Sequence, residues 1–155
     1  MRSFFVWVGV AAMALAVIVA GGVAYMVHLG SGLDKESRAY ADSAVTAITS
    51  TWDSQALTSR ASLALLKLTP PDRLGALFGW FSSLGKLTSQ QDCTGQASVF
   101  AMAGQPTRTL AHYRCDEQYE HGAATVSLSL IKGDNGWEIN GFNVSSPALI
   151  PVKRL

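Results

Sequence analysis

Residues 107–144, TRTLAHYRCDEQYEHGAATVSLSLIKGDNGWEINGFNV, decide the fold of this chain. Apolar and polar side chains alternate along them with a period of two, which is typical of strands with one buried face. Turn-forming residues interrupt the alternation at Glu120–Gly122 and at Gly133–Gly136. A similar run begins after Gly85 and ends at Gly104–Pro106. We predict an antiparallel meander of four strands, at roughly residues 90–103, 107–119, 122–132 and 136–146.

Counting outward from these turns gives a register for the whole sheet. Turn centres near residues 104, 120.5 and 134.5 place Cys93 opposite Cys115 and produce rows of side chains that share a face. The first face consists of the rows Cys93, Cys115, Val126; Gly95, Tyr113, Leu128, Gly141; Ala97, Ala111, Leu130, Ile139; and Val99, Thr109, Trp137. The opposite face contains the rows Gln96, His112, Ser129, Asn140 and Thr94, Arg114, Ser127, Phe142. The first face is the more apolar, so we expect helices to cover it.

The residues before Gly85 instead show the 3.6-residue period of amphipathic helices. We predict a first helix from Lys35 to Trp52, preceded by an N-cap at Asp34, and a second helix through Leu57 and Leu66. Prolines at positions 70 and 71 end the second helix, and a third continues to a stop at Gly85. The predicted fold class is therefore α+β, with helices packed on a curved four-stranded antiparallel sheet.

An uncharged, mostly apolar segment runs from Phe4 to Val27. As a helix it is about 36 Å long, which exceeds the roughly 30 Å hydrocarbon core of a bilayer. Arg2 precedes the segment and acidic residues follow it, which predicts a cytoplasmic N-terminus and a periplasmic domain at the bacterial inner membrane. The alternative is a cleaved signal peptide, because Ala20-x-Gly22 and Gly22-x-Ala24 offer small residues for signal peptidase. The domain is exported in either case.

The chain is 155 residues long, with 12 basic and 11 acidic side chains and a net charge of +1. No basic cluster is present, which argues against nucleic acid as the main partner. We divide the chain into an anchor over residues 1–29, a linker over 30–33, an exported domain over 34–146 and an extended tail over 147–155. One small domain of this length holds one core.

Cys93 and Cys115 are the only cysteines, and the predicted register places them opposite each other. In an exported domain this favours a disulfide bond between them. Closing a loop of that length adds about 3 kcal/mol of stability, mainly by restricting the unfolded chain. Two free buried thiols are the alternative.

The segment GDNGWEINGFNV, Gly133 to Val144, has a Gly-Trp-x-x-x-Gly-Phe pattern on the last predicted strand. Together with the helix end at Trp52 and the segment Phe81–Gly85, it resembles the nuclear transport factor two-like, or cystatin-like, superfamily. The resemblance implies a cone-shaped domain similar to small exported bacterial domains of unassigned function. That superfamily includes ketosteroid isomerase-like enzymes, small-ligand binders and membrane-anchored secretion-system scaffolds. The resemblance assigns no catalytic residue to this chain.

No motif for catalysis, a metal or a cofactor stands out. His28, His112 and His121 lie far apart, and no HxH, HExxH or CxxC pattern occurs. Nucleophile-elbow, P-loop and dinucleotide-binding motifs are also missing from the sequence. We therefore expect no metal and no cofactor.

The best acid–base candidates are His112, Arg114 and Asp116, with Asp92 expected opposite Asp116. Alternate residues of a strand share a face, so these side chains could cooperate. A solvated strand face has the same pattern, and catalytic groups also need a concave, desolvated setting. We assign no catalytic residue, and an enzymatic function is the least favoured interpretation.

A small apolar ligand is one candidate for binding. The row Tyr113, Gly95, Leu128 and Gly141 contains two glycines, which leave room between sheet and helices, with the Tyr113 hydroxyl as a polar contact. Alternatively, an aromatic ring fills that room, because protein interiors are close-packed.

A protein partner is the other candidate. We predict an apolar patch on the opposite face of the sheet, mixed with two arginines and suited to a protein partner or to a second copy of the chain. The patch residues are Phe100, Leu110, Ile131, Phe142, Val144, Arg108 and Arg114. The expected function is a membrane-anchored interaction or accessory module of an envelope system, and a small-ligand-binding domain is the alternative.

Overall fold

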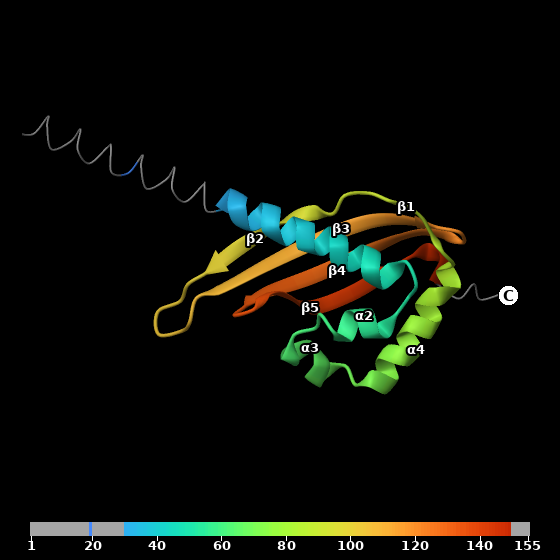
Figure 1. The fold of residues 1–155 in the computed structure, drawn as a ribbon, viewed down its shortest axis with the longest axis horizontal. Coiled ribbons are helices and arrows are strands. Elements are labelled where there is room, and N and C mark those ends of the chain that lie inside the picture. The colour runs from blue at the N-terminus through green and yellow to red at the C-terminus, as the bar shows by residue number, and fades with distance from the viewer. Residues whose placement is uncertain (1–18, 20–29, 150–155) are drawn as a thin grey trace, which may run out of the picture. The chain divides into compact units, whose positions relative to one another are not determined.

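The computed structural model describes residue 19 and residues 30–149 (Figure 1). The chain divides into two compact units, Met1–Leu33 and Asp34–Leu155. The predicted anchor segment, residues 4–27, lies outside the described residues except for Val19. Among the helices that the structure describes, none has the length and apolar character needed to cross a membrane.

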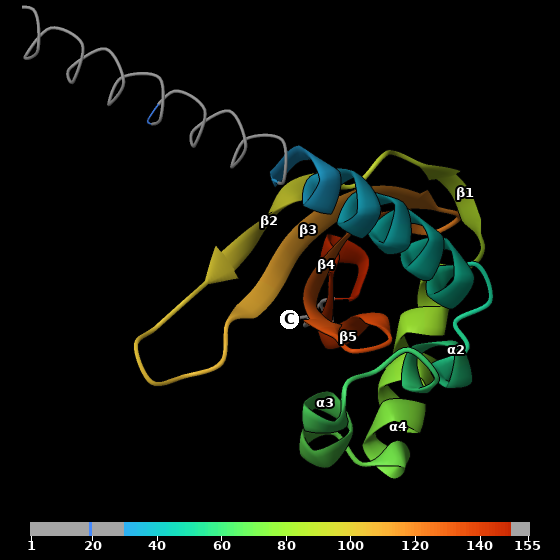
Figure 2. The ribbon, with the colours of Figure 1, turned by 60° about the vertical axis from the view of Figure 1, so that its left-hand side comes forward.

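The domain is an α+β structure, as predicted (Figures 1 and 2). A long helix covers residues 30–49, and its residues from Asp34 onward belong to the domain. It is followed by α2 (Ser54–Thr58), α3 (Leu63–Leu68), α4 (Pro71–Phe81) and a 3₁₀ turn, η1 (Ser82–Leu84). The strands are β1 (Leu87–Gln90), β2 (Thr94–Phe100), β3 (Arg108–Tyr119), β4 (Gly122–Gly133) and β5 (Gly136–Ser145), and a second 3₁₀ turn, η2 (Pro147–Leu149), follows.

All strand pairs in the sheet are antiparallel. The order is β1-β3-β4-β5, and β2 also pairs with β3. The single strand predicted at 90–103 is therefore two short strands, β1 and β2, along the same side of β3. They are separated at residues 91–93, where the Gln91 N–H still donates to the Asp116 carbonyl oxygen at 3.3 Å. The predicted tail also differs, because Pro147–Leu149 forms a helical turn and Leu149 is buried. Residues 150–155 lie outside the described part.

The predicted register is correct for β2 with β3 and for β3 with β4, but β1 is displaced by one residue from the predicted register, since Gln90 pairs with Glu117. Gly95 pairs with Tyr113, and Tyr113 pairs with Leu128. Between β4 and β5 the prediction is correct from Leu130 to the turn at Gly133. It is wrong for the pairs from Ser129 back to Thr125, because the ladder shifts by one residue between Ser129 and Leu130. Phe142 therefore pairs with Leu128 on the helix-covered face instead of with Ser127. A bulge of this kind inserts one residue and reverses the face of every later side chain.

Capping residues and contacts with β5 set where the short helices begin and end. Asp53 caps α2 through its side chain, which accepts a hydrogen bond from the Gln55 N–H at 2.8 Å. The predicted second helix is two short helices, because the backbone between them binds the edge of β5. The Ser62 N–H donates to the Ile139 carbonyl oxygen, and the Ile139 N–H donates to the Arg60 carbonyl oxygen, both at 2.8 Å. Gly85 follows η1 at φ 82°, as expected for a terminating glycine.

The long helix begins earlier than predicted. Residues 30–33, which were expected to form a flexible linker, are helical. Asp34 is thus inside the helix rather than at its N-cap, and its carboxylate accepts a hydrogen bond from the Ala97 N–H at 2.7 Å. Arg38 donates to the Gly95 carbonyl oxygen at 3.5 Å, and Asp42 accepts from the Cys93 N–H at 2.8 Å. These three side chains, one helical turn apart, satisfy backbone groups of β2 and of Cys93, the residue that precedes it.

The core lies between the sheet and the helices. The long helix contributes Ala41, Val45 and Ile48, all fully buried. The helix ends at residue 49 rather than at the predicted Trp52, and the Trp52 ring in the following turn packs against Phe81 and Tyr119, with centroids 5.7 and 5.2 Å away. The predicted disulfide between Cys93 and Cys115 is present, and both cysteines are fully buried.

Candidate functional site

The row predicted to leave room for a ligand is occupied by Tyr113. Its side chain is only 2% exposed, and its hydroxyl lies 2.8 Å from the Ser37 Oγ and donates to the Asp34 carbonyl oxygen at 3.1 Å. A Cβ placed on Gly95 would lie 1.9 Å from the His112 carbonyl oxygen and 2.8 Å from the Tyr113 ring. The space beside Gly95 is therefore already taken by the neighbouring strand.

The remaining members of that row separate. Leu128 lies beside Tyr113, but Gly141 pairs with Ser129 because of the shift in β5, so it belongs to the opposite face. Neither of the two cavities described below is lined by Tyr113, Gly95, Leu128 or Gly141.

The residues of the predicted partner patch also divide between two faces. Leu110 and Ile131 pair directly and are half-buried, and Phe100 is 54% exposed at the end of β2. Phe142 lies on the helix side, where its ring stacks on Phe78 of α4 with centroids 6.0 Å apart. Val144 is on the same side and buried. The β5 bulge explains the difference.

The polar series on β3 is exposed to solvent. His112 Nδ1 lies 3.1 Å from the Ser129 Oγ. The Arg114 Nε lies 3.7 Å from an Asp116 carboxylate oxygen, and both side chains are more than half exposed. Asp92 does not pair with Asp116, because Gln91 occupies that position on the neighbouring edge. These groups have the solvated setting that the sequence left open as an alternative.

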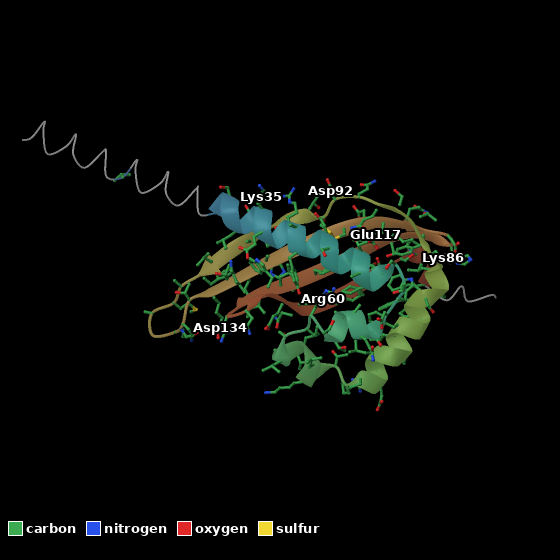
Figure 3. All side chains as sticks on the ribbon, in the orientation of Figure 1. Lys35, Arg60, Lys86, Asp92, Glu117 and Asp134 are labelled. Atoms are coloured by element: carbon green, nitrogen blue, oxygen red, sulfur yellow. A yellow bond between two sulfur atoms is a disulfide. The ribbon has the colours of Figure 1, made fainter. Side chains whose placement is uncertain are left out.

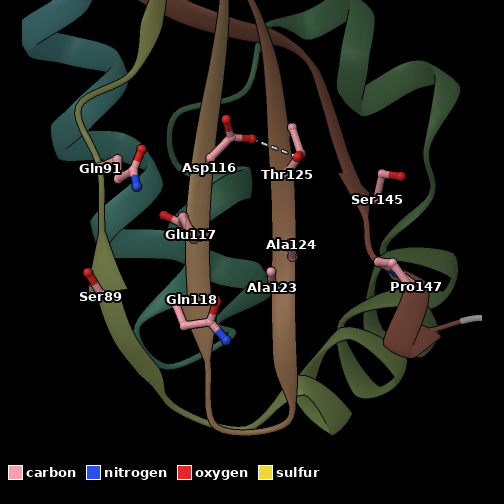
Figure 4. A pocket seen from close by; sticks show the side chains of 10 residues that line it. All are labelled: Ser89, Gln91, Asp116, Glu117, Gln118, Ala123, Ala124, Thr125, Ser145 and Pro147. Carbon is pink, nitrogen blue, oxygen red and sulfur yellow. Dashed lines mark hydrogen bonds between the residues drawn. The ribbon is translucent and has the colours of Figure 1, made fainter.

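A shallow depression of about 290 Å³ lies on the face of the sheet away from the helices, near the β3–β4 turn (Figure 4). Asp116 accepts a hydrogen bond from Thr125 at 2.7 Å at its upper edge (Figure 4). The residues that line it are Ser89, Gln91, Asp116, Glu117, Gln118, Ala123, Ala124, Thr125, Ser145 and Pro147. Its hydroxyl, amide and carboxylate groups can form hydrogen bonds with a polar ligand.

Glu117 is the one acidic side chain buried among the described residues, at 3% exposed, and it lies next to the long helix (Figure 3). Its carboxylate accepts hydrogen bonds from Thr49 at 3.4 Å and from the Tyr119 hydroxyl. Burial raises the pKa of Glu117, and the two hydrogen bonds lower it by a smaller amount. Burial also raises the pKa of Tyr119, so its hydroxyl remains a donor at neutral pH. Both carboxylate oxygens are engaged, which indicates a structural group rather than a free acid.

A second, more apolar cavity lies between the short helices and the end of β5. It has a volume of about 190 Å³. The side chains around it are Leu57, Leu65, Thr69, Leu74, Leu77, Phe78, Trp80, Phe81, Phe142, Asn143 and Val144. The stacked pair Phe78 and Phe142 forms part of its wall, so the bulge that turns Phe142 inward also builds this groove.

Large apolar side chains extend from this groove onto the surface of α3 and α4. We call them the α3–α4 apolar face; they are Leu63 (75% exposed), Leu66 (36%), Leu68 (78%), Leu77 (41%) and Trp80 (50%). A cluster of this kind is unusual on a small soluble surface and often marks an interaction site. This face was not predicted from the sequence. The signal was the segment LALLKL, residues 63–68, whose four leucines fall on more than one side of a helix and cannot all face the core.

In the part of the chain that the structure describes, no three His, Cys, Asp or Glu side chains come close enough to hold a metal ion. Comparisons with protein-family models, with curated proteins and with solved structures found no match.

Proposed function

We propose that this chain is a membrane-anchored, extracytoplasmic interaction module that binds an apolar segment of a protein partner on its α3–α4 apolar face. The apolar run from Phe4 to Val27 supports the anchor. The Cys93–Cys115 disulfide supports an oxidising compartment, because such bonds persist outside the cytoplasm. The curved sheet packed on a long helix is compatible with a cone-like domain of the nuclear transport factor two-like superfamily.

The observation that carries the proposal is the exposed apolar rim around a small groove. The groove volume of about 190 Å³ is below the range of about 300–1,000 Å³ that is usual for small-molecule sites. It is large enough for one or two apolar side chains of a partner. Trp80 stands at the rim with half of its surface exposed, and tryptophan is enriched among residues that dominate binding energy.

The charges near the groove indicate what kind of segment fits. Lys67 and Arg73 are exposed on α3 and α4, and Asp72 is the acidic side chain between them. The local balance is positive, so a partner segment with apolar residues flanked by carboxylates has complementary charge. Rim charges of this type mainly raise the association rate and select the partner.

A second candidate function is the binding of a small apolar ligand in the same groove. The observation in its favour is the aromatic wall made by Phe78, Phe81 and Phe142. Such a ligand would use the interior of the groove and would not need the outer leucines of α3, so the two candidates differ in their dependence on Leu63 and Leu68.

Site-specific photocrosslinking of the full chain in intact membranes tests the proposal. A photoreactive residue at Leu77 is expected to form an adduct of one discrete protein mass. The variant Leu68→Glu should reduce that adduct about tenfold or more, because it places a charge in the apolar rim and repels an acidic segment. Ser127→Glu, at an exposed position on the sheet face away from the helices, is the matched control and should leave the adduct unchanged.

Three outcomes contradict the proposal. An adduct of small-molecule mass that survives Leu68→Glu favours the ligand candidate. A protein adduct unaffected by Leu68→Glu shows that the α3 leucines do not bind the partner. Lys67→Glu combined with Arg73→Glu should weaken the protein adduct, and a stronger adduct would show that the partner segment is basic rather than acidic.

A further inference from the structure

We propose that the tip of the β2–β3 hairpin inserts its apolar side chains into the membrane interface. We define this β2–β3 tip as residues 99–107; it includes Val99, Phe100 and Met102. The occupant to which we commit is the lipid bilayer itself. The inference rests on the anchor in the proposed function, but not on the α3–α4 apolar face.

The direction of the hairpin comes from its contacts with the long helix. Asp34 binds the Ala97 backbone, Arg38 binds Gly95, and Asp42 binds Cys93. The helix residue number rises as the strand residue number falls, so the helix and β2 run in opposite directions. β2 therefore continues past Asp34 toward the N-terminal end of the helix. This end of the domain is the one that follows the apolar segment 4–27 in the sequence.

Chain length limits how far the membrane can be from this end of the domain. Val27 and Asp34 are separated by seven residues, which span at most about 25 Å even when fully extended. From Ala97 to Met102 the hairpin advances about 16 Å. A domain held this close to the bilayer by its anchor therefore has a projecting hairpin within reach of the headgroup layer.

The composition of the tip fits the interface. Val99, Phe100 and Met102 are 55%, 54% and 68% exposed. From Ala97 to Thr107 the sequence ASVFAMAGQPT contains no charged side chain. The Gln105 N–H donates to the Met102 carbonyl oxygen at 3.1 Å, so the turn satisfies one of its own backbone groups. Apolar residues on a compact turn of this kind can enter the interface at low cost in unpaired polar groups.

Basic side chains lie at the base of the tip. Arg108 is exposed and pairs with Phe100 across the hairpin. Lys35 is exposed at the same end of the domain, which also carries the β4–β5 turn with Asp134 (Figure 3). The nearby Glu36 is already paired with Lys132 at 2.7 Å. Cations behind an apolar tip are suited to anionic headgroups.

The test uses the full chain reconstituted in vesicles of phosphatidylethanolamine and phosphatidylglycerol. The photoreactive residue p-benzoyl-phenylalanine replaces Phe100 in one protein, Val17 of the apolar segment in a second, and Leu68 in a third. Leu68 is the control, since it is an apolar residue outside the hairpin that is more exposed than Phe100 (78% against 54%). Irradiation followed by mass spectrometry measures phospholipid adducts.

We expect lipid adducts at Phe100 to exceed those at Leu68 by about fivefold or more, with strong adducts at Val17 as well. With the probe retained at Phe100, Met102→Glu should reduce the lipid adduct by a similar factor, because a carboxylate in the tip opposes insertion next to anionic lipid. Met102 is mostly exposed, so this change does not disturb the core.

The possible failures are distinguishable. Adducts at Val17 with only the Leu68 level at Phe100 would overturn the hairpin inference and leave the anchor intact. Lipid adducts at neither Val17 nor Phe100 would overturn both. Protein dimers instead of lipid adducts at Phe100 would show that the tip binds a second copy, which also overturns the inference.

Discussion

Phe142 of β5 stacks on Phe78 of α4, with ring centroids 6.0 Å apart and planes inclined at 22°. This contact joins the sheet to the short helices and forms a wall of the apolar groove. It exists because the bulge in β5 turns Phe142 toward the helices.

The two phenylalanines of the predicted patch should therefore respond differently to truncation. Phe142→Ala should lower the free energy of unfolding by about 2 kcal/mol, through lost burial and a new void. Phe100→Ala should change it by less than about 0.5 kcal/mol, because Phe100 is exposed. Guanidinium unfolding of the full chain in detergent micelles measures both values. Equal losses would contradict the assignment of the two rings to different faces.

Two glycines give a matched pair of alanine substitutions. Gly95→Ala should destabilise the domain by about 1–3 kcal/mol, since the new Cβ would overlap the His112 carbonyl oxygen and push β2 from β3. Gly75→Ala, in α4 with open space at its Cβ, should stabilise it by about 0.5–1 kcal/mol because alanine is the better helix former. Thermal unfolding of the two variants is the measurement. A neutral Gly95→Ala would mean that the strands can separate without cost.

The buried Glu117 should make stability depend on pH. Its pKa is raised in the folded protein by burial, so the folded state holds the proton more tightly than the unfolded state. The stability that this gives is complete below the ordinary glutamate value of about 4.3 and is lost as the pH rises through the folded pKa. Relative to the parent, Glu117→Gln should therefore gain in melting temperature as the pH rises across that window. If the melting temperatures of the two proteins change by the same amount at every pH, this prediction is refuted.

Removal of the disulfide should weaken the domain without changing its register. The two cysteines are 22 residues apart, and a loop of this size is worth about 3 kcal/mol. Cys93→Ala combined with Cys115→Ala should lower the free energy of unfolding by that amount, and reductant should then have no further effect. Hydrogen exchange of the β2 and β3 amides checks the register. Loss of β2–β3 protection throughout would show that the bond, rather than the strand pairing, sets the register.

Much of the fold follows from local pattern. The turns at 104–106, 120–122 and 133–136 fixed three strand pairings and brought Cys93 opposite Cys115. The break between α2 and α3 was not predictable in this way, because it depends on the hydrogen bonds that Arg60 and Ser62 form with β5. No local signal in residues 54–66 identifies that partner.

The candidate site was less predictable than the fold. A one-residue bulge in β5, opposite Ser129 and Leu130 of β4, changes the face of Phe142. Turn positions alone do not reveal a bulge inside a strand. The apolar groove needs the correct face of Phe142 together with the approach of α4, so it arises only from the three-dimensional arrangement. The Tyr113 row leaves no room for a ligand for a different reason. Its pairing with Gly95 and Leu128 was predicted correctly, but the tyrosine itself occupies the space.

The side chains of Asp34, Arg38 and Asp42 limit how two copies of this protein can associate through their sheets. An open strand edge is a template on which a second chain can polymerise. Here those three side chains bind backbone groups of Cys93, Gly95 and Ala97, and the backbone of Arg60 and Ser62 binds β5 at the other edge. A neighbouring copy is thus denied a free ladder at the middle of either edge. Extension of the sheet at these positions would first have to break those hydrogen bonds.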